Sequence, residues 1–325
     1  MWFYLLLIGI ATLYFMRTKK KARVAGGVFV TGCDSGMGKE VAEAAAAAGF
    51  SPVFAGCFTK EGQRRSSWSH PAIHPVALDV TSDESVAQAV KTVRATLKKD
   101  GGKLIGLIQC AGIPVVAPAE YLTQDLLQRQ MDVNFMGYVR MATSLLPVIR
   151  EGATAARRGL LMFTSSGGFP GPSPPMLAAY MASKWAGEAY AQALRLELRL
   201  QELPIDVAMI APGFTRPTGL ESAGAALLER SWAAMPPAAR EEYGPMSDAI
   251  VRFNKEQPGT HVSAVGKAAV EALTDGEPRL HYYVGFDSKA GYFVGLIPSS
   301  WREYLLRNSM LMYFDKCPKL GFRCP

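Results

Sequence analysis

The chain has 325 residues, of which 49% are hydrophobic, and a formal net charge of +7. A chain this apolar can bury enough surface to offset its ordering entropy, so the composition excludes intrinsic disorder. The charge does not indicate nucleic-acid binding, because five basic residues lie between Arg17 and Arg23. Subtracting these five from +7 leaves +2, without basic residues interleaved with aromatic ones.

Residues 2 to 16 are uncharged and almost wholly apolar, and the basic residues follow them directly. Fifteen helical residues measure about 22 Å, which is shorter than a hydrocarbon layer of roughly 30 Å. We expect this segment either to span a locally thinned bilayer or to lie in its interface. The order of apolar and basic residues is the reverse of that in a signal peptide, and it predicts a cytoplasmic location for the domain that follows.

The cysteines and histidines show no ligand pattern. The five cysteines are scattered and lack a CxxC pair, which favours a reducing compartment over a disulfide framework or a structural zinc site. His70 and His74 lie among prolines, without a nearby glutamate or third ligand. We therefore expect no metal.

From residue 28 onward, short apolar runs alternate with helical stretches, a pattern typical of βαβ units and a parallel sheet. The expected strands are residues 28–30, 52–57, 76–78, 104–109, 160–164 and 205–210. The expected helices are residues 38–49, 82–98, most of 122–149, and 178–203, with a proline-rich loop over 169–175. We expect a membrane anchor with its basic flank (1–24), one doubly wound α/β domain (25–285) and an apolar helical extension (286–325).

The glycine-rich stretch TGCDSGMG, residues 31–38, lies between the first expected strand and the first expected helix. Glycines let the backbone approach a pyrophosphate, and a helix N-terminus offers unpaired N–H groups to an anion. The stretch therefore predicts a dinucleotide site, with a tight turn that binds no ligand as the alternative. The expected cofactor contacts here are Gly32, Ser35, Gly36, Met37 and Gly38.

This TGxxxGxG spacing resembles that of the short-chain dehydrogenase/reductase family, which implies a Rossmann-type fold and an NAD or NADP cofactor. The resemblance extends to the ends of the third and fourth expected strands. Gln109 and Cys110 stand where the family has two asparagines, so the contacts that those asparagines make within the sheet should differ here. The further cofactor contacts implied by the family are Asp79, Val80, Ala111 and Gly112.

The end of the second expected strand is where such a fold reads the ribose 2′ position. An acid there accepts from the free hydroxyl, and a basic residue favours the phosphate. The sequence has Phe58, Thr59 and Lys60, followed by Arg64 and Arg65. No acid occupies the expected place, but the cations could equally be solvated loop residues. The choice between NAD and NADP stays open, with Thr59 as a cofactor contact.

Tyr180 and Lys184 form a YxxxK motif near the start of a helix, and their spacing sets both side chains on one face. A free phenol has a pKa near 10, so a tyrosine that acts as a base at pH 7 needs on the order of 4 kcal/mol of differential stabilisation. A neighbouring ammonium supplies help of the right sign. We expect Tyr180 to be the catalytic acid/base and Lys184 its partner.

The family resemblance implies two further catalytic side chains. A serine after the fifth strand should hold the substrate oxygen. The distance to Tyr180 favours Ser166, whereas the SxxG form with Gly168 favours Ser165; we take Ser166 as the candidate and keep Ser165 as the alternative. Asn134 matches the family's helix asparagine, which holds a water that links the lysine to solvent; a surface polar residue is the alternative.

The loop after the sixth expected strand should touch the nicotinamide carboxamide, as the family resemblance implies. Pro212 and Gly213 match the family pattern. The family's threonine is expected about five residues after the proline, but Pro217 stands there, between Thr215 and Thr218. Thr215 is the candidate contact.

The stretches TGCDSGMG, GFSPVFAGCF and MDVNFMGYV are similar to one branch, which holds the 17β- and 11β-hydroxysteroid dehydrogenases, the retinol dehydrogenases and 3-hydroxybutyrate dehydrogenase. The branch implies an NAD(P)-dependent oxidoreductase that interconverts an alcohol and its carbonyl on a steroid, retinoid or similar lipid. The alternatives are a dehydrogenase of a small hydroxy acid and a non-catalytic, cofactor-binding scaffold. With the apolar N-terminus, the branch indicates the endoplasmic reticulum membrane, with the catalytic domain facing the cytoplasm. A homo-oligomer is compatible with the family.

Residues 286–315 form a dense apolar stretch that is broken by Arg302 and Arg307. It could wall an apolar substrate tunnel, rest on a bilayer, or pack on the core. The region between Phe214 and Lys255 should cover the substrate.

Overall fold

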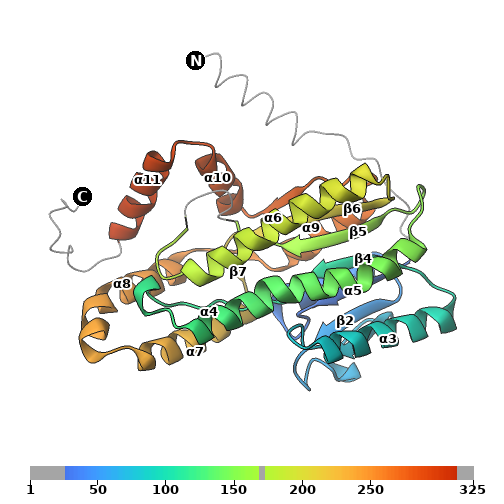
Figure 1. The fold of residues 1–325 in the computed structure, drawn as a ribbon, viewed down its shortest axis with the longest axis horizontal. Helices are drawn as coiled ribbons and strands as arrows, with labels where there is room; N and C mark the ends of the chain where they lie inside the picture. The colour runs from blue at the N-terminus through green and yellow to red at the C-terminus, as the bar shows by residue number, and fades with distance from the viewer. Residues whose placement is uncertain (1–25, 168–172, 313–325) are drawn as a thin grey trace, which may run out of the picture.

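The computed structural model describes residues 26–167 and 173–312 (Figure 1). The predicted membrane segment, residues 2 to 16, lies outside these ranges, as do most of the proline-rich loop and the last residues of the apolar stretch. Within residues 26–167 and 173–312, no helix combines the length and the apolar character that a membrane crossing requires.

The core of the fold is one seven-stranded sheet in the order β3-β2-β1-β4-β5-β6-β9, with every neighbouring pair parallel. This is the predicted doubly wound sheet. The strands are β1 (Gly27–Thr31), β2 (Val53–Cys57), β3 (Ile73–Ala77), β4 (Leu104–Gln109), β5 (Gly159–Thr164), β6 (Ile205–Pro212) and β9 (His281–Val284).

Two strands differ from the prediction for clear reasons. β3 begins at Ile73 and contains Pro75, which interrupts the apolar run in the sequence. Pro75 is tolerated because β3 is an edge strand, where a missing N–H breaks no ladder on the open side. β9 was not predicted, because its sequence HYYV is short and lacks an apolar run.

Helices cover both faces of the sheet (Figure 1). On one face, α3 (Asp83–Asp100), α5 (Gly137–Gly152) and α6 (Ala178–Leu200) pack on the sheet through one apolar cluster. On the other face, α2 (Gly36–Ala47) and α9 (Ser263–Thr274) pack through a second cluster. The alanines of α2 are small, which lets α2 and α9 lie against each other. The result is a three-layer α/β domain.

The helix expected over 122–149 is in fact two α-helices joined by a π-helical turn. α4 (Gln124–Met131) leads into π-helical residues Asp132–Met136, which continue directly into α5. A π turn inserts one extra residue and breaks the regular ladder, and such turns are frequent at functional sites. Asn134 lies within this turn and is fully buried.

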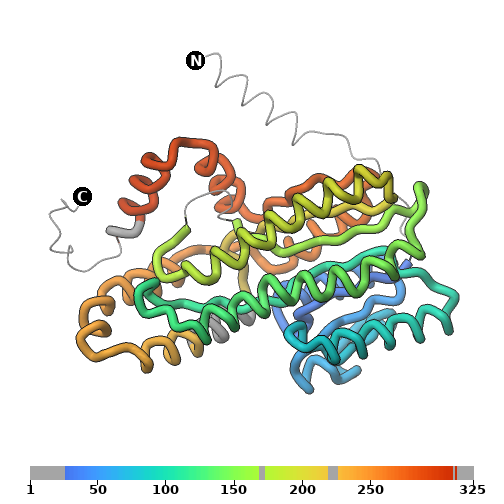
Figure 2. Tube along the Cα trace, in the orientation of Figure 1, coloured from blue at the N-terminus to red at the C-terminus, as the bar shows by residue number. Residues whose placement is uncertain are grey.

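The remaining elements gather at one end of the molecule, beyond the helices that cover the sheet (Figure 2). They are the strand pair β7 (Thr215–Arg216) and β8 (Thr260–His261), with α7 (Gly219–Ala234), α8 (Pro237–Glu256), α10 (Phe286–Gly295) and α11 (Ser299–Leu311). α10 follows β9 directly, and α11 lies against α8. Two short 3-10 turns, Arg65–Ser67 and Ala119–Tyr121, complete the described chain.

Candidate active site

The glycine-rich turn packs closely against the start of α2 and the end of β4. Gly32 has φ +70°, and a Cβ there would lie 2.7 Å from the backbone of Ala111. A Cβ at Gly38 would overlap the carbonyl oxygen of Gly32. The Ser35 hydroxyl makes no capping hydrogen bond, and no acid lies in the first turn of α2. The N-terminus of α2 is therefore open to an anion such as a pyrophosphate.

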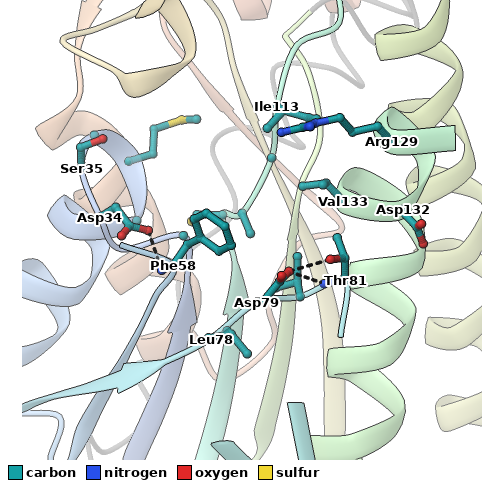
Figure 3. Close-up of a pocket in the computed structure, with 18 of the residues that line it drawn as sticks. Asp34, Ser35, Phe58, Leu78, Asp79, Thr81, Ile113, Arg129, Asp132 and Val133 are labelled. Atoms are coloured by element: carbon teal, nitrogen blue, oxygen red, sulfur yellow. Dashed lines mark hydrogen bonds between the residues drawn. The ribbon is translucent and has the colours of Figure 1, made fainter. Parts of the chain in front are cut away.

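A cavity of about 620 Å³ opens beside this turn, in the range typical of ligand sites (Figure 3). Nine of the predicted cofactor contacts line it: Gly32, Ser35, Gly36, Met37, Gly38, Asp79, Val80, Ala111 and Gly112. The turn, the helix N-terminus and the cavity together fit a dinucleotide. Residues that the sequence reasoning did not assign also line it, namely Asp34, Phe58, Leu78, Thr81, Cys110, Ile113, Asp125, Gln128, Arg129, Asp132, Val133 and Thr218.

The carboxylate of Asp34 lies at the end of β2, where the sequence showed no acid. It accepts hydrogen bonds from the backbone N–H groups of Phe58 (3.0 Å) and Thr59 (2.7 Å) and from the Thr59 hydroxyl (2.6 Å). Thr59 therefore holds Asp34 and is not in the cavity wall. The signal missed in the sequence is that an acid in the glycine-rich turn can occupy the same place in space as an acid after β2.

The cations that follow β2 are engaged within their own loop. Arg64 pairs with Glu61 at 2.5 Å, and Arg65 donates to the carbonyls of Trp68 (3.1 Å) and His70 (2.8 Å). Neither arginine lines the cavity. Phe58 does line it and is 69% exposed, on the side of the cavity toward Asp79 (Figure 3).

Tyr180 and Lys184 lie on one side of α6, as their spacing predicted. The Lys184 Nζ is 5.6 Å from the centre of the Tyr180 ring, and it donates to the Tyr138 hydroxyl (3.1 Å) and the Thr164 carbonyl (2.9 Å). Burial raises the pKa of the Tyr180 phenol to about 12 and lowers the pKa of the Lys184 ammonium to about 8. Burial thus moves the two pKa values apart, because it disfavours the charged form of each group.

The two serines after β5 have different surroundings. Ser165 is 1% exposed, and its hydroxyl donates to the carboxylate of Glu188 on α6. Ser166 is partly exposed. No residue in the ranges 26–167 and 173–312 forms a hydrogen bond with the Ser166 hydroxyl. Glu188 did not feature in the sequence reasoning, and only the Tyr180, Lys184, Glu188 spacing of four residues could have indicated it.

Asn134 holds the segment that follows β4. Its side-chain carbonyl accepts from the Ile113 N–H (2.8 Å), and its amide donates to the Ile113 carbonyl (3.0 Å) and the Ser183 hydroxyl (3.2 Å). A Cβ on Gly112 would lie 3.4 Å from Asn134 Oδ1 and 3.8 Å from Lys184 Nζ. Asn134 and Lys184 therefore face the same cavity-wall residue, and Asn134 is not a surface residue.

Gln109 and Cys110, which replace the family's asparagines, make sheet contacts of their own. The Gln109 amide donates to the Tyr138 carbonyl (3.2 Å), and the Cys110 sulfur accepts from the Thr164 hydroxyl (3.7 Å). The Tyr138 hydroxyl donates to the Thr164 carbonyl (3.1 Å). The substitutions thus still tie β4 to α5 and β5, beside Lys184.

The loop that follows β6, residues 212–218, is the one expected to touch the nicotinamide carboxamide and is called the carboxamide loop below. Contacts with β9 and α10 hold it in place. Gly213 N–H donates to the Val284 carbonyl (2.9 Å), and the Asp287 carboxylate accepts from the Phe214 N–H (2.6 Å). A Cβ on Gly213 would overlap that carboxylate. Thr215 turns back on its own loop, where its hydroxyl donates to the Gly213 carbonyl (3.0 Å). The cavity wall contains Thr218 and not the expected Thr215, because Thr215 opens the short strand β7.

Comparison with known proteins settles the family. The profile of the family described as short chain dehydrogenase matches residues 27–226. The chain belongs to the short-chain dehydrogenase/reductase family. Among its relatives, retinol dehydrogenase 5 of Homo sapiens is 33% identical over 96% of this chain and 97% of its own. The 17-beta-hydroxysteroid dehydrogenase type 6 of Homo sapiens is 31% identical over 87% of this chain and 88% of its own.

A solved short chain dehydrogenase from Burkholderia cenocepacia J2315, in complex with NADP, has the same fold with a TM-score of 0.63. It is 21% identical and covers 87% of this chain and 97% of its own. Membership of the family makes the chain an oxidoreductase that acts on CH–OH groups with NAD or NADP. The predicted branch, which holds the hydroxysteroid, retinol and 3-hydroxybutyrate dehydrogenases, is confirmed.

Proposed function

We propose that this short-chain dehydrogenase/reductase interconverts an alcohol and its carbonyl on an apolar lipid such as a retinoid or steroid, with Tyr180 as the acid/base. The observation that carries the proposal is the buried Lys184 ammonium beside the Tyr180 ring, next to a cavity that fits a dinucleotide. A bound nicotinamide cofactor supplies the hydride acceptor or donor. The protein supplies the groups that hold the substrate oxygen and move its proton.

Four side chains divide that work. Tyr180 takes the alcohol proton during oxidation and returns it during reduction. Lys184 favours the phenolate by its charge, because an opposite charge nearby stabilises an anion. Ser166 holds the substrate oxygen. Asn134, which faces Gly112 together with Lys184, marks the end of a proton path to water.

The apolar substrate class is supported by the names of the relatives and by an apolar cluster beside the start of α6. Met176 and Ile250 form a buried apolar cluster there, against which Leu306 of α11 packs. Turnover of a panel of retinoids, steroids and short hydroxy acids, each with NAD and with NADP, tests the proposal. We expect turnover with members of the lipid classes. Turnover of 3-hydroxybutyrate alone would favour the small-acid alternative, and no turnover at all would favour a scaffold.

The cofactor that we propose is NAD. The adenosine ribose is read at the end of β2, and the Asp34 carboxylate is held there by Phe58 and Thr59. A carboxylate accepts from a free 2′-hydroxyl but repels a 2′-phosphate, and like-charge juxtaposition costs several kcal/mol. Arg64 and Arg65, which could have favoured the phosphate, are engaged elsewhere.

Asp34→Asn should therefore shift the cofactor preference toward NADP. We expect the ratio of kcat/KM for NAD over NADP to be at least about 100 in the natural protein and to fall at least about 10-fold in the variant. The amide keeps the shape of the carboxylate and removes its charge. Glu84→Gln is the matched control, because Glu84 is an exposed acid at the start of α3, outside the cavity wall and without contact to Arg64 or Arg65. An unchanged ratio in Asp34→Asn would show that another group reads the 2′ position.

We also propose that the α10–α11 arm rests on a bilayer. Trp301 is 63% exposed, and Tyr304, Leu305 and Met312 follow it at helical spacing as exposed apolar residues. Phe286 and Phe293 of α10 and Leu296, which follows α10, are exposed as well. Exposed Lys289 and Arg307 lie on the same two helices. Aromatic and basic residues of this kind favour the membrane interface.

Vesicle sedimentation tests the arm separately from residues 2 to 16. A chain that begins at Gly26 should still bind vesicles of zwitterionic and anionic lipid. The double substitution Trp301→Ser, Leu305→Ser should weaken that binding about 10-fold or more, because each removes buried apolar area. Equal binding by both chains would contradict a role of the arm.

A further inference from the structure

Glu188 is a buried acid next to the candidate catalytic groups that the proposed chemistry does not use. It lies on α6, one turn after Lys184 and two turns after Tyr180, and is 1% exposed. One carboxylate oxygen accepts from the Ser165 hydroxyl. The other accepts from His281 Nε2 at 2.9 Å. Both oxygens of a buried carboxylate are thus occupied by side chains from other elements.

The pairing joins three elements across the sheet. Ser165 follows β5, Glu188 lies on α6, and His281 opens β9 opposite Met209 of β6. The His281 ring stacks on Tyr283 at 5.5 Å between ring centres, which fixes its orientation. A buried carboxylate costs several kcal/mol unless it is paired and hydrogen-bonded. The hydrogen bonds from His281 and Ser165 offset part of this cost.

The backbone on either side of Ser166 is hydrogen-bonded to β6. Ser165 N–H donates to the Ile210 carbonyl (2.8 Å), and Gly167 N–H donates to the Pro212 carbonyl (2.7 Å). A Cβ on Gly167 would lie 2.7 Å from Gly213, so the serine loop rests directly on the carboxamide loop. With the backbone hydrogen-bonded to β6 and the Ser165 hydroxyl bound to Glu188, Ser166 is the one of the two candidate serines whose hydroxyl has no partner within residues 26–167 and 173–312.

We propose that Glu188 and His281 are a positioning pair that anchors Ser165 and thereby assigns the substrate-holding role to Ser166. The inference rests on the proposed function, because it concerns the serine of that same reaction. The sequence left Ser165 and Ser166 open, since spacing to Tyr180 and the SxxG form disagreed. The Glu188 carboxylate decides between the two serines, because the Ser165 hydroxyl already donates its hydrogen to it.

Glu188 has a second effect through charge. It raises the pKa of Lys184, as the Cys110 thiol also does, against the stronger lowering by burial. The other titratable groups facing the ammonium are the phenols of Tyr180 and Tyr138. Removing the Glu188 charge should therefore make the Lys184 ammonium easier to deprotonate. This effect accompanies the positioning role and gives Glu188→Gln a signature in the pH profile.

Four single variants test the assignment, Ser165→Ala, Ser166→Ala, Glu188→Ala and Glu188→Gln, together with the double variant that combines Ser165→Ala with Glu188→Ala. Ser166→Ala should lower kcat about 10²- to 10³-fold, the usual loss for one donor to a reacting oxygen. Ser165→Ala and Glu188→Ala should each lower kcat about 10-fold. The double variant should be no worse than Glu188→Ala alone, because both remove the same contact. The amide oxygen of Glu188→Gln can still accept from Ser165, so kcat of this variant at pH 7 should be close to that of the natural protein. As the pH rises, its activity should begin to fall at a lower pH than in the natural protein, because Lys184 loses its proton more easily.

Two readouts besides turnover separate positioning from general damage. Fluorescence titration with NADH should give a Kd within about twofold of the natural protein in all four variants. Hydrogen exchange of residues 159–167 should speed up in Ser165→Ala and Glu188→Ala but not in Ser166→Ala, because only the first two release the loop. Glu197→Gln, an exposed acid later on α6, is the control and should change nothing.

A larger loss of kcat in Ser165→Ala than in Ser166→Ala would overturn the proposal, as would additive losses in the double variant. Turnover by Tyr180→Phe in the same assay would instead show that the proposed function itself is wrong. Where Glu188→Ala does not fold, the two serine variants and Glu188→Gln decide the question, since each is smaller or isosteric.

Discussion

Tyr180→Phe should lower kcat for alcohol oxidation by about 10³-fold or more, because it removes the only atom of Tyr180 that can carry the proton. In the protein without substrate, burial holds the pKa of this phenol at about 12, so the reactive phenolate is scarce at neutral pH. Oxidation should therefore speed up as pH rises toward about 8, above which the Lys184 ammonium loses its proton, and reduction, which needs the phenol, should slow down. In Tyr180→Phe the residual rate should lose this pH dependence. Initial rates in both directions between pH 6 and pH 10 provide the measurement.

The matched control is Tyr190→Phe. Tyr190 lies on the same helix and packs against the rings of Phe163 and Phe135, away from Lys184. The Tyr190→Phe variant should have the same kcat as the natural protein. NADH should bind Tyr180→Phe as it binds the natural protein, which shows that the fold and the cavity are intact. Undiminished turnover in Tyr180→Phe would contradict the acid/base assignment.

Lys184→Met should lower kcat about 10²- to 10³-fold with little change in stability. The ammonium is buried, and burial lowers its pKa from 10.5 to about 8. Because the folded-state pKa is depressed, the folded protein is penalised below about pH 8 and gains stability as pH rises from there toward 10.5. Replacing a buried charge with an apolar group of similar length removes this penalty. The Tyr138 hydroxyl keeps its hydrogen bond to the Thr164 carbonyl, so no buried donor is left unpaired.

Thermal unfolding and steady-state kinetics on the same samples measure both quantities. We expect the free energy of unfolding at pH 7 to change by less than about 1 kcal/mol, and the gain of stability above pH 8 to disappear in Lys184→Met. Lys184→Arg keeps a charge but not its compact shape, and it should recover only part of the activity. A variant that unfolds and loses activity together would indicate that Lys184 is structural.

The fold was largely predictable because its pattern is local. The six expected strands form within three residues at either end, and the helix expected from residue 82 begins there, where the Ser82 hydroxyl caps α3 by accepting from the Ser85 N–H at 3.1 Å. The π turn at Asn134 was not predictable, because nothing in the local sequence distinguishes it from a continuous α-helix. β9 was missed because its stability comes from its pairing with β6.

The motifs of the candidate site were predictable, but their partners were not. Tyr180, Lys184 and the glycine-rich turn are visible because their chemistry requires fixed spacings. Asp34 and Glu188 act across the fold, on residues 25 and 23 positions away, so only the tertiary structure shows what they contact. Thr215 was assigned by counting from Pro212, and the short strand β7 turns it away from the cavity.

Transfer of deuterium from substrate to cofactor tests the central claim most directly. The full chain in lipid vesicles would be given NAD and the most active retinoid or steroid alcohol of the panel, deuterated at the carbinol carbon, in a single turnover. Mass spectrometry should find NADH that carries one deuterium, formed by the natural protein and absent in Tyr180→Phe. Bound NAD that stays unreduced with every apolar alcohol would contradict the account.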